Sequence, residues 1–186
     1  MEETVAEQSE RQRGTMAQLL TFVIDTEEYG VEILRVQEIR GWSRPMPIPN
    51  TPSYVLGVIN IRGDIVPIAD LRERLGIERR AVGPTTAVVV LRVGQGARQR
   101  IMGIVVDAMS DVTDVAMDQI KPPPDFGAAS QSGLTKGIAT LTDKMVTILE
   151  VDRIFPGMSA AGGMSAAGGM SAAGPPAPAT AQGEAA

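Results

Sequence analysis

The feature that most constrains the fold is a succession of short apolar runs through the middle of the chain, rich in β-branched residues and separated by turn-forming residues. Short runs bounded in this way are typical of β-strands. Strands are expected at residues 19–25, 29–33, 36–40, 56–61, 65–68, 86–93, 100–106, 109–115 and 145–151. These are too many for one small open sheet, whereas closure into one or two small barrels would remove the exposed strand edges. The sequence therefore predicts an all-β fold.

The segments between these runs carry turn and cap signals. Turns with acidic residues or glycine are expected at residues 27–28, 62–64 and 94–98. The last two predict hairpins, because short glycine-containing connections suit antiparallel strand pairs. Helix is expected only as short turns, at residues 70–76 and 151–155. In the first of these turns, Asp70 is the predicted N-cap and Gly76 lies just past the end.

The two ends of the chain differ from its middle. Residues 1–18 are charged and almost without apolar periodicity, and they predict a flexible N-terminal segment. Residues 156–186 consist largely of Ala, Gly, Ser and Pro and contain three tandem copies of Gly-Met-Ser-Ala-Ala-Gly at 157–174. Such a segment cannot bury enough apolar surface to offset its ordering entropy, so a disordered tail is expected. The domain is predicted to span residues 19–155.

Composition excludes several classes of function. The chain has no His and no Cys, which excludes a cysteine nucleophile, a histidine base, zinc sites of the Cys/His kind and disulfide bonds. A net charge of −5 and only 3% aromatic residues argue against nucleic-acid binding. Neither a signal peptide nor a membrane-spanning apolar run is found. We therefore expect a cytoplasmic protein with no cofactor, no metal site and no direct membrane insertion.

Carboxylates are the remaining candidates for chemistry. Asp107, Asp111 and Asp114 form the densest group, but their spacing is not that of an EF-hand calcium loop. A solvated strand edge protected by charge is the favoured interpretation. Asp64 and Asp70 are a conceivable acid–base pair, although nothing near them suggests a nucleophile or an oxyanion hole. The chain is therefore predicted not to be an enzyme, and a carboxylate-dependent hydrolase using Asp64 or Asp107 is the less favoured alternative.

A binding surface is the other possibility that the residues offer. Val36, Glu38 and Arg40 share one face of a predicted strand, and Ile39 lies on the other face. Arg62 lies in a tight turn, from which its planar fork of donors could reach a carboxylate of a partner. From the residues alone, an ordinary solvated face is slightly favoured over a binding site.

Several segments, taken together, resemble the core motifs of the CheW-like family, the bacterial chemotaxis coupling proteins. They are Val-Gln-Glu-Ile-Arg-Gly at 36–41, Ile-Pro-Asn-Thr-Pro at 48–52, and the stretches 57–72, 103–112, 138–140 and 148–152. The resemblance covers essentially all of residues 19–155, in order and with sensible spacing.

This resemblance implies two SH3-like five-stranded β-barrels packed around a shared apolar core, and no catalysis. It implies an adaptor that bridges the cytoplasmic signalling tips of chemoreceptors to the regulatory domain of the histidine kinase CheA. It also implies receptor arrays that hold further copies of the adaptor, at the inner face of the cell membrane. The same resemblance leaves open an adaptor in a chemosensory pathway that controls pili or development.

The family's motifs also imply roles for individual residues. The implied receptor contacts are Val36, Glu38 and Arg62. The residues implied to shape the backbone beneath them are Gly57, Asn60 and Gly63. A contact with either the kinase or the receptor is assigned to Ile39 and Arg40. The family's Asn-Leu-Arg-Gly motif reads Asn-Ile-Arg-Gly here, a conservative change at Ile61 that keeps Arg62.

Overall fold

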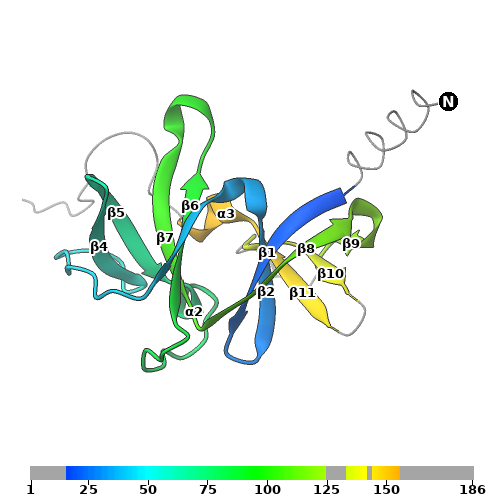
Figure 1. Cartoon of the computed structure of the whole chain (residues 1–186), viewed down its shortest axis with the longest axis horizontal. Helices are drawn as coiled ribbons and strands as arrows, with labels where there is room; N and C mark the ends of the chain where they lie inside the picture. The colour runs from blue at the N-terminus through cyan, green and yellow to red at the C-terminus, as the bar shows by residue number, and fades with distance from the viewer. Residues whose placement is uncertain (1–15, 125–132, 142–143, 156–186) are drawn as a thin grey trace, which may run out of the picture.

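Two β-sheets make up most of the protein (Figure 1). The structure is a computed structural model that describes residues 16–124, 133–141 and 144–155. The predicted tail, 156–186, lies outside the described residues, and so does all of the predicted N-terminal segment except residues 16–18. Those three residues belong to the first strand, which begins at Met16.

The first sheet has six strands in the order β8-β1-β2-β11-β10-β9. Its strands are β1 (Met16–Ile24), β2 (Glu27–Glu32), β8 (Ala108–Ala116), β9 (Ile120–Lys121), β10 (Thr135–Thr140) and β11 (Met145–Leu149). Neighbouring strands are antiparallel except β2 and β11, which are parallel. The sheet thus joins strands from both ends of the domain.

The second sheet has five strands in the order β3-β6-β7-β5-β4. They are β3 (Val36–Gly41), β4 (Val55–Ile61), β5 (Asp64–Asp70), β6 (Ala87–Val93) and β7 (Arg100–Val106). The chain beyond β3 reaches the outer edge of β4, where Met46 and Val58 exchange two backbone hydrogen bonds of 2.8 and 2.9 Å. This bridge brings the two edges of the sheet together. The result is a curled, SH3-like sheet, although neither strand order closes on itself within the described residues.

The chain passes between the two sheets twice. The first passage is η1 (Ile33–Arg35), a 3₁₀ turn between β2 and β3, and the second is the single residue Asp107 between β7 and β8. Figure 1 shows the consequence: the blue strands β1 and β2 lie in one sheet with the last four strands, β8 to β11, and the strands between them, β3 to β7, form the other.

Three apolar clusters form the core. The largest lies between the sheets and includes Phe22, Leu91, Ile104 and Ile154, each fully buried. The second sheet encloses a cluster of its own (Ile61, Val66, Ile68, Val88, Val90, Val105), and so does the first sheet (Leu19, Val115, Ala139, Ile148). Alternate residues of β6 therefore enter different clusters, and this explains why the strand is apolar throughout. The expected all-β pair of barrel-like units around a shared core is confirmed.

The short helices are also confirmed. In α2 (Leu71–Arg74), the side chain of Asp70 accepts a hydrogen bond from the backbone N–H of Arg72, at 3.0 Å. Gly76 follows with a φ of +75°, as expected for the residue that ends a helix. The second helix, α3 (Val151–Ile154), directly follows the last strand, which is two residues shorter than expected.

The sequence was misleading in three places. Glu27 and Glu28 belong to β2, because the turn uses Asp25 at a φ of +58° together with the residue after it. β9 and β10 were not expected from apolar runs; with them the first sheet has six strands, where the resemblance implied five. Asp107 does not belong with the edge carboxylates, because it lies at a passage between the sheets. Asp111 and Asp114 do lie exposed on β8, at an edge of the first sheet.

Candidate functional site

The hairpin between β4 and β5 presents Arg62. Ile61 and Asp64 are paired residues, so the loop consists of Arg62 and Gly63 alone, with φ values of +53° and +99°. Two positive φ values are the hallmark of the tight turn that matches strand twist. The side-chain oxygen of Asn60 accepts a hydrogen bond from the N–H of Gly63, at 2.9 Å, and fixes the turn. The Arg62 side chain is consequently 84% exposed.

Gly57 lies under the bridge that curls the second sheet. Its φ is +138°, and a Cβ added there would lie 2.1 Å from the carbonyl oxygen of Met46. Because no side chain fits in that space, glycine is what allows Met46 to pair with Val58. Gly57, Asn60 and Gly63 thus set the course of the backbone around Arg62.

Glu38 on β3 lies between two arginines. Its Oε2 is 3.3 Å from Nη2 of Arg62, and its Oε1 is 3.6 Å from Nη1 of Arg40. We call Glu38, Arg40 and Arg62 the Glu38 cluster. The side chain of Glu38 is 20% exposed, so the carboxylate forms the base of the cluster and Arg62 its outermost part. The curl of the sheet brings these residues together, since β3 and β4 are its opposite edges.

The other two predicted contact residues lie apart from this cluster. Val36 is half-buried and packs against the core between the sheets. Ile39 lies on the opposite face of β3 and is 47% exposed. Glu38 and Arg40 share one face of β3, as predicted. Val36 does not, because a β-bulge between Val36 and Glu38 pairs Val36 with Leu91 on the face of the core between the sheets, so the expectation that all three residues share a face is wrong.

Sequence reasoning missed further exposed apolar side chains on the second sheet and at the first passage. Met46 is 66% exposed, Ile65 63% and Leu34 83%. Ile65 lies beside a cleft of about 410 Å³ between the starts of β5 and β7, whose lining includes Ile101. Alternation in 65–68 could have placed Ile65 outside, because Val66 and Ile68 face the core. No sequence signal marks Leu34 as exposed, because its position depends on a 3₁₀ turn.

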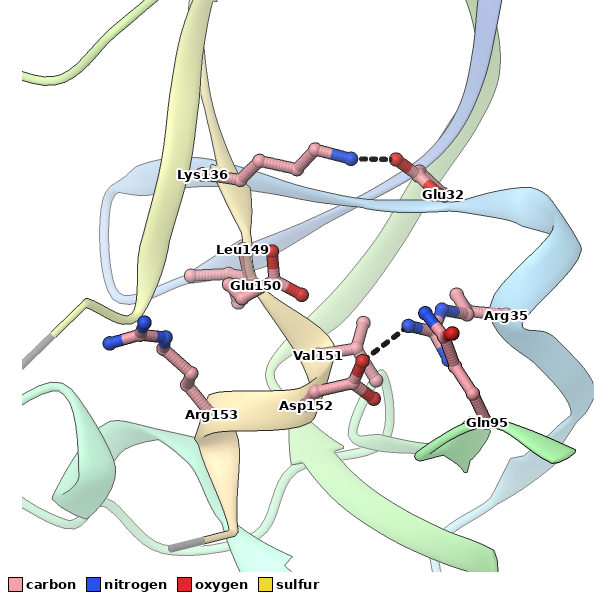
Figure 2. A pocket seen from close by; sticks show the side chains of 9 residues that line it. All are labelled: Glu32, Arg35, Gln95, Lys136, Leu149, Glu150, Val151, Asp152 and Arg153. Carbon is pink, nitrogen blue, oxygen red and sulfur yellow. Dashed lines mark hydrogen bonds and ion pairs between the residues drawn. The ribbon is translucent and has the colours of Figure 1, made fainter. Parts of the chain in front are cut away.

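A second cleft, of about 430 Å³, lies between η1, β10, α3 and the β6–β7 hairpin (Figure 2). Arg35 and Asp152 form an ion pair across it, with Nη2 and Oδ2 separated by 2.5 Å. Lys136 pairs with Glu32 on another wall. Arg35 was not predicted as a functional residue, because its partner is 117 residues away in the chain.

The carboxylates considered for hydrolytic chemistry do not form the expected pair. Asp64 and Asp70 lie at opposite ends of β5, roughly 20 Å apart at the usual rise per strand residue, so the conceived acid–base pair is wrong. Asp107 is engaged by Arg72 in an ion pair. The described residues hold no group of three or more carboxylates that could bind a metal ion. Within the same residues, no helix is long and apolar enough to cross a membrane.

The geometry of Arg62 is suited to recognition of another molecule. An exposed ion pair contributes little to stability, because solvent screens it. The donors of Arg62 that do not face Glu38 are open to a carboxylate on another molecule, and Glu38 holds the base of the fork in place. The Glu38 cluster is therefore a candidate contact surface for an acidic group on a partner protein.

Comparisons with known proteins give a consistent result. The family model of the CheW-like domain matches residues 18–157. The chain is 38% identical to the chemotaxis protein CheW of Rhizobium meliloti over 139 residues, which cover 75% of this chain and 87% of the relative. It is 39% identical to that of Klebsiella aerogenes over 137 residues, which cover 74% and 80%. A solved scaffolding protein, TtCheW of Thermoanaerobacter tengcongensis, matches with a TM-score of 0.69 and 29% identity, over 75% of this chain and 92% of the other.

Proposed function

This chain belongs to the CheW-like family, and we propose that it is a non-catalytic chemotaxis adaptor that links chemoreceptor signalling tips to the regulatory domain of the histidine kinase CheA. The observation that carries the proposal is the Glu38 cluster, which lies within the residues that the family model matches and leaves Arg62 84% exposed. Several relatives are named chemotaxis proteins, and the solved one is described as a scaffolding protein. In this role the protein would be recruited to receptor clusters at the inner face of the membrane.

The receptor contact is assigned to Val36, Glu38 and Arg62. Receptor tips are helical hairpins, so a carboxylate on a helix face would meet the exposed fork of Arg62. Ile39 and Arg40 are assigned to the kinase or the receptor. Ile39 suits a separate partner, because it lies on the other face of β3 from Glu38.

Coupling by such an adaptor needs no chemistry of its own. The assembly must bias the kinase between two states, and the adaptor contributes contacts that differ between those states. Each single contact would have a modest affinity, and further copies of the adaptor in an array would prolong the lifetime of the assembly through avidity.

The direct test mixes the full chain with its cognate kinase regulatory domain and with receptor signalling tips. We expect each partner to bind alone and all three to co-elute in size-exclusion chromatography. If neither partner associates with the chain, the proposed function is wrong.

Arg62→Ala is expected to weaken binding to receptor tips about tenfold, because a charge-assisted, bidentate contact is lost. The fold should be unaffected, with a change of no more than about 0.5 kcal/mol in the free energy of unfolding, since the side chain is 84% exposed. Isothermal titration and thermal unfolding measure the two effects. Arg44→Ala, which removes an exposed arginine elsewhere on the same chain, is the matched control and should bind normally. Unfolding of the Arg62 variant would contradict the surface assignment.

We also propose that residues 19–155, extended to Met16 because β1 begins there, suffice for this function. A chain ending at Phe155 should keep both its thermal stability and its coupling of receptor to kinase. Removing residues 151–155 as well should destabilise it strongly, because Val151, Ile154 and Phe155 are buried in the core between the sheets. A large loss of coupling in the longer truncated chain would show that residues 156–186 take part in the function.

A further inference from the structure

Each passage of the chain between the sheets carries one charged residue that is bonded on both sides. At the first passage, Nη1 of Arg35 donates to the carbonyls of Arg92 and Gly94, at 3.3 and 3.0 Å, where β6 of the second sheet ends. Nη2 of the same side chain pairs with Asp152 of α3, which comes after the last strand of the first sheet. Figure 2 shows the pair of Arg35 and Asp152. The N–H of Gly94 also donates to Asp152, at 2.7 Å, so Arg35, Gly94 and Asp152 are each bonded to the other two.

At the second passage the charged residue is an aspartate, Asp107, instead of an arginine. Oδ2 of Asp107 accepts a hydrogen bond of 2.7 Å from the N–H of Asp25, in the turn between β1 and β2. Oδ1 of Asp107 pairs with Arg72 of α2, which comes after β5 of the second sheet. The two passages lie at opposite ends of the contact between the sheets (Figure 1). One bonded group at each passage thus links the two sheets, in addition to the apolar core between them and to the hydrogen bond of 2.7 Å from Nε of Arg74 to the carbonyl of Ile154.

The two groups differ in how well they are protected from water. The side chains of Arg72 and Asp107 are 5% and 20% exposed, whereas those of Arg35 and Asp152 are 20% and 33% exposed. The Arg35 pair also borders the cleft of about 430 Å³. Water screens an exposed pair more than a buried one, so we expect the first passage to open more easily than the second.

The first passage leads directly into the strand of the proposed receptor contact. β3 begins at Val36, the residue after Arg35, and Glu38 comes two residues later. The hydrogen bonds and the ion pair of Arg35 are therefore the last side-chain contacts that hold the chain before Val36 and Glu38. On the other side of it, Leu34 extends from the same 3₁₀ turn and is 83% exposed.

We propose that Arg35 and Asp152 are positioning residues: their ion pair fixes the start of β3 and thereby holds Val36 and Glu38 in the geometry that binds the receptor. The effect on receptor binding rests on the proposed function, whereas the effect on the position of β3 does not. When the pair is broken, η1 and the start of β3 loosen, while the buried pair at Asp107 keeps the sheets together. Loosening then lowers receptor affinity without touching a contact residue.

The test uses the full chain with Arg35→Ala, Asp152→Ala and, for rescue, Arg35→Lys, which keeps the charge facing Asp152. Lys136→Ala is the matched control, because it breaks an ion pair on the same cleft that joins two strands of the first sheet only. Three quantities are measured for each variant: amide hydrogen exchange along the chain, affinity for receptor tips, and affinity for the kinase regulatory domain.

For both alanine variants we expect exchange in residues 33–41 to accelerate about tenfold, with the amides around Asp107 unchanged. Receptor affinity should fall roughly three- to tenfold while kinase affinity stays the same, and Arg35→Lys should recover part of the loss. The control should match the wild type in all three measurements.

Two results would overturn the proposal. One is exchange in residues 33–41 that stays at the wild-type rate. The other is an equal acceleration throughout the domain with both affinities reduced together, because that is the signature of a general loss of stability. If the wild type itself fails to bind receptor tips, the proposed function is wrong, and the exchange pattern alone decides whether Arg35 positions β3.

Discussion

Gly57→Ala is expected to destabilise the protein by about 3–5 kcal/mol, close to the upper end for single substitutions. The new Cβ would lie 2.1 Å from the carbonyl oxygen of Met46, and alanine would have to adopt a φ of +138°. To remove the contact with Met46 and the unfavourable φ, the backbone must move, and this separates Met46 from Val58. The second sheet would then lose the bridge that joins its edges, and receptor binding should fall with it.

Chemical denaturation measures this effect, and the protein supplies its own reporter. Trp42, the single tryptophan, packs against the second sheet's own cluster, so its fluorescence reports on this sheet directly. Gly41→Ala is the matched control, because a Cβ added there meets nothing within 4 Å. We expect that variant to unfold within about 0.5 kcal/mol of the wild type. A Gly57 variant of normal stability would show that the bridge can move aside at little cost.

Arg72→Met is expected to cost about 2–4 kcal/mol of stability, because removing one partner of a buried ion pair leaves the other carboxylate without its counter-charge. The arginine side chain is 5% exposed and pairs with Asp107, and it also donates to the carbonyl of Arg80 at 3.0 Å. The uncompensated charge of Asp107 accounts for most of the cost.

A double-mutant cycle separates that cost from the loss of packing. Adding Asp107→Asn to Arg72→Met removes the uncompensated charge, so the double variant should be more stable than the sum of the two single changes predicts. The exposed pair Lys136 and Glu32 provides the comparison, because Lys136→Ala should change the free energy of unfolding by less than about 1 kcal/mol. Strict additivity at Arg72 and Asp107 would mean that their pairing contributes nothing to the fold.

The parts of the fold that the sequence predicts well are those fixed by local pattern. β6 and β7 are apolar on both faces because each face enters a different cluster, which leaves a continuous run that is easy to recognise. The turn at residues 62–63 is predictable from its residue types, and so is the cap at Asp70. β10 could not be found in this way, since Lys136 and Gly137 interrupt its pattern and its neighbours β9 and β11 hold it in place.

The site was predictable only in part, and for a similar reason. Alternation places Glu38 and Arg40 on one face of a strand, but nothing local brings Arg62 to them. That meeting depends on the curl of the second sheet, which in turn depends on Gly57 accepting a close backbone approach. Arg35 and Asp152 are 117 residues apart, and only the packing of the two sheets makes them neighbours.

The order of strands also has a consequence for synthesis on the ribosome. The second sheet is one uninterrupted stretch, so all its strands are available once residue 106 has emerged. The hairpin of β1 and β2 is made first, yet its outer neighbours β8 and β11 are among the last parts of the domain to be translated. We expect the nascent chain to carry this hairpin with both outer edges unpaired throughout that interval. A chaperone that protects the growing chain should therefore bind residues 16–32, at the very start of the fold.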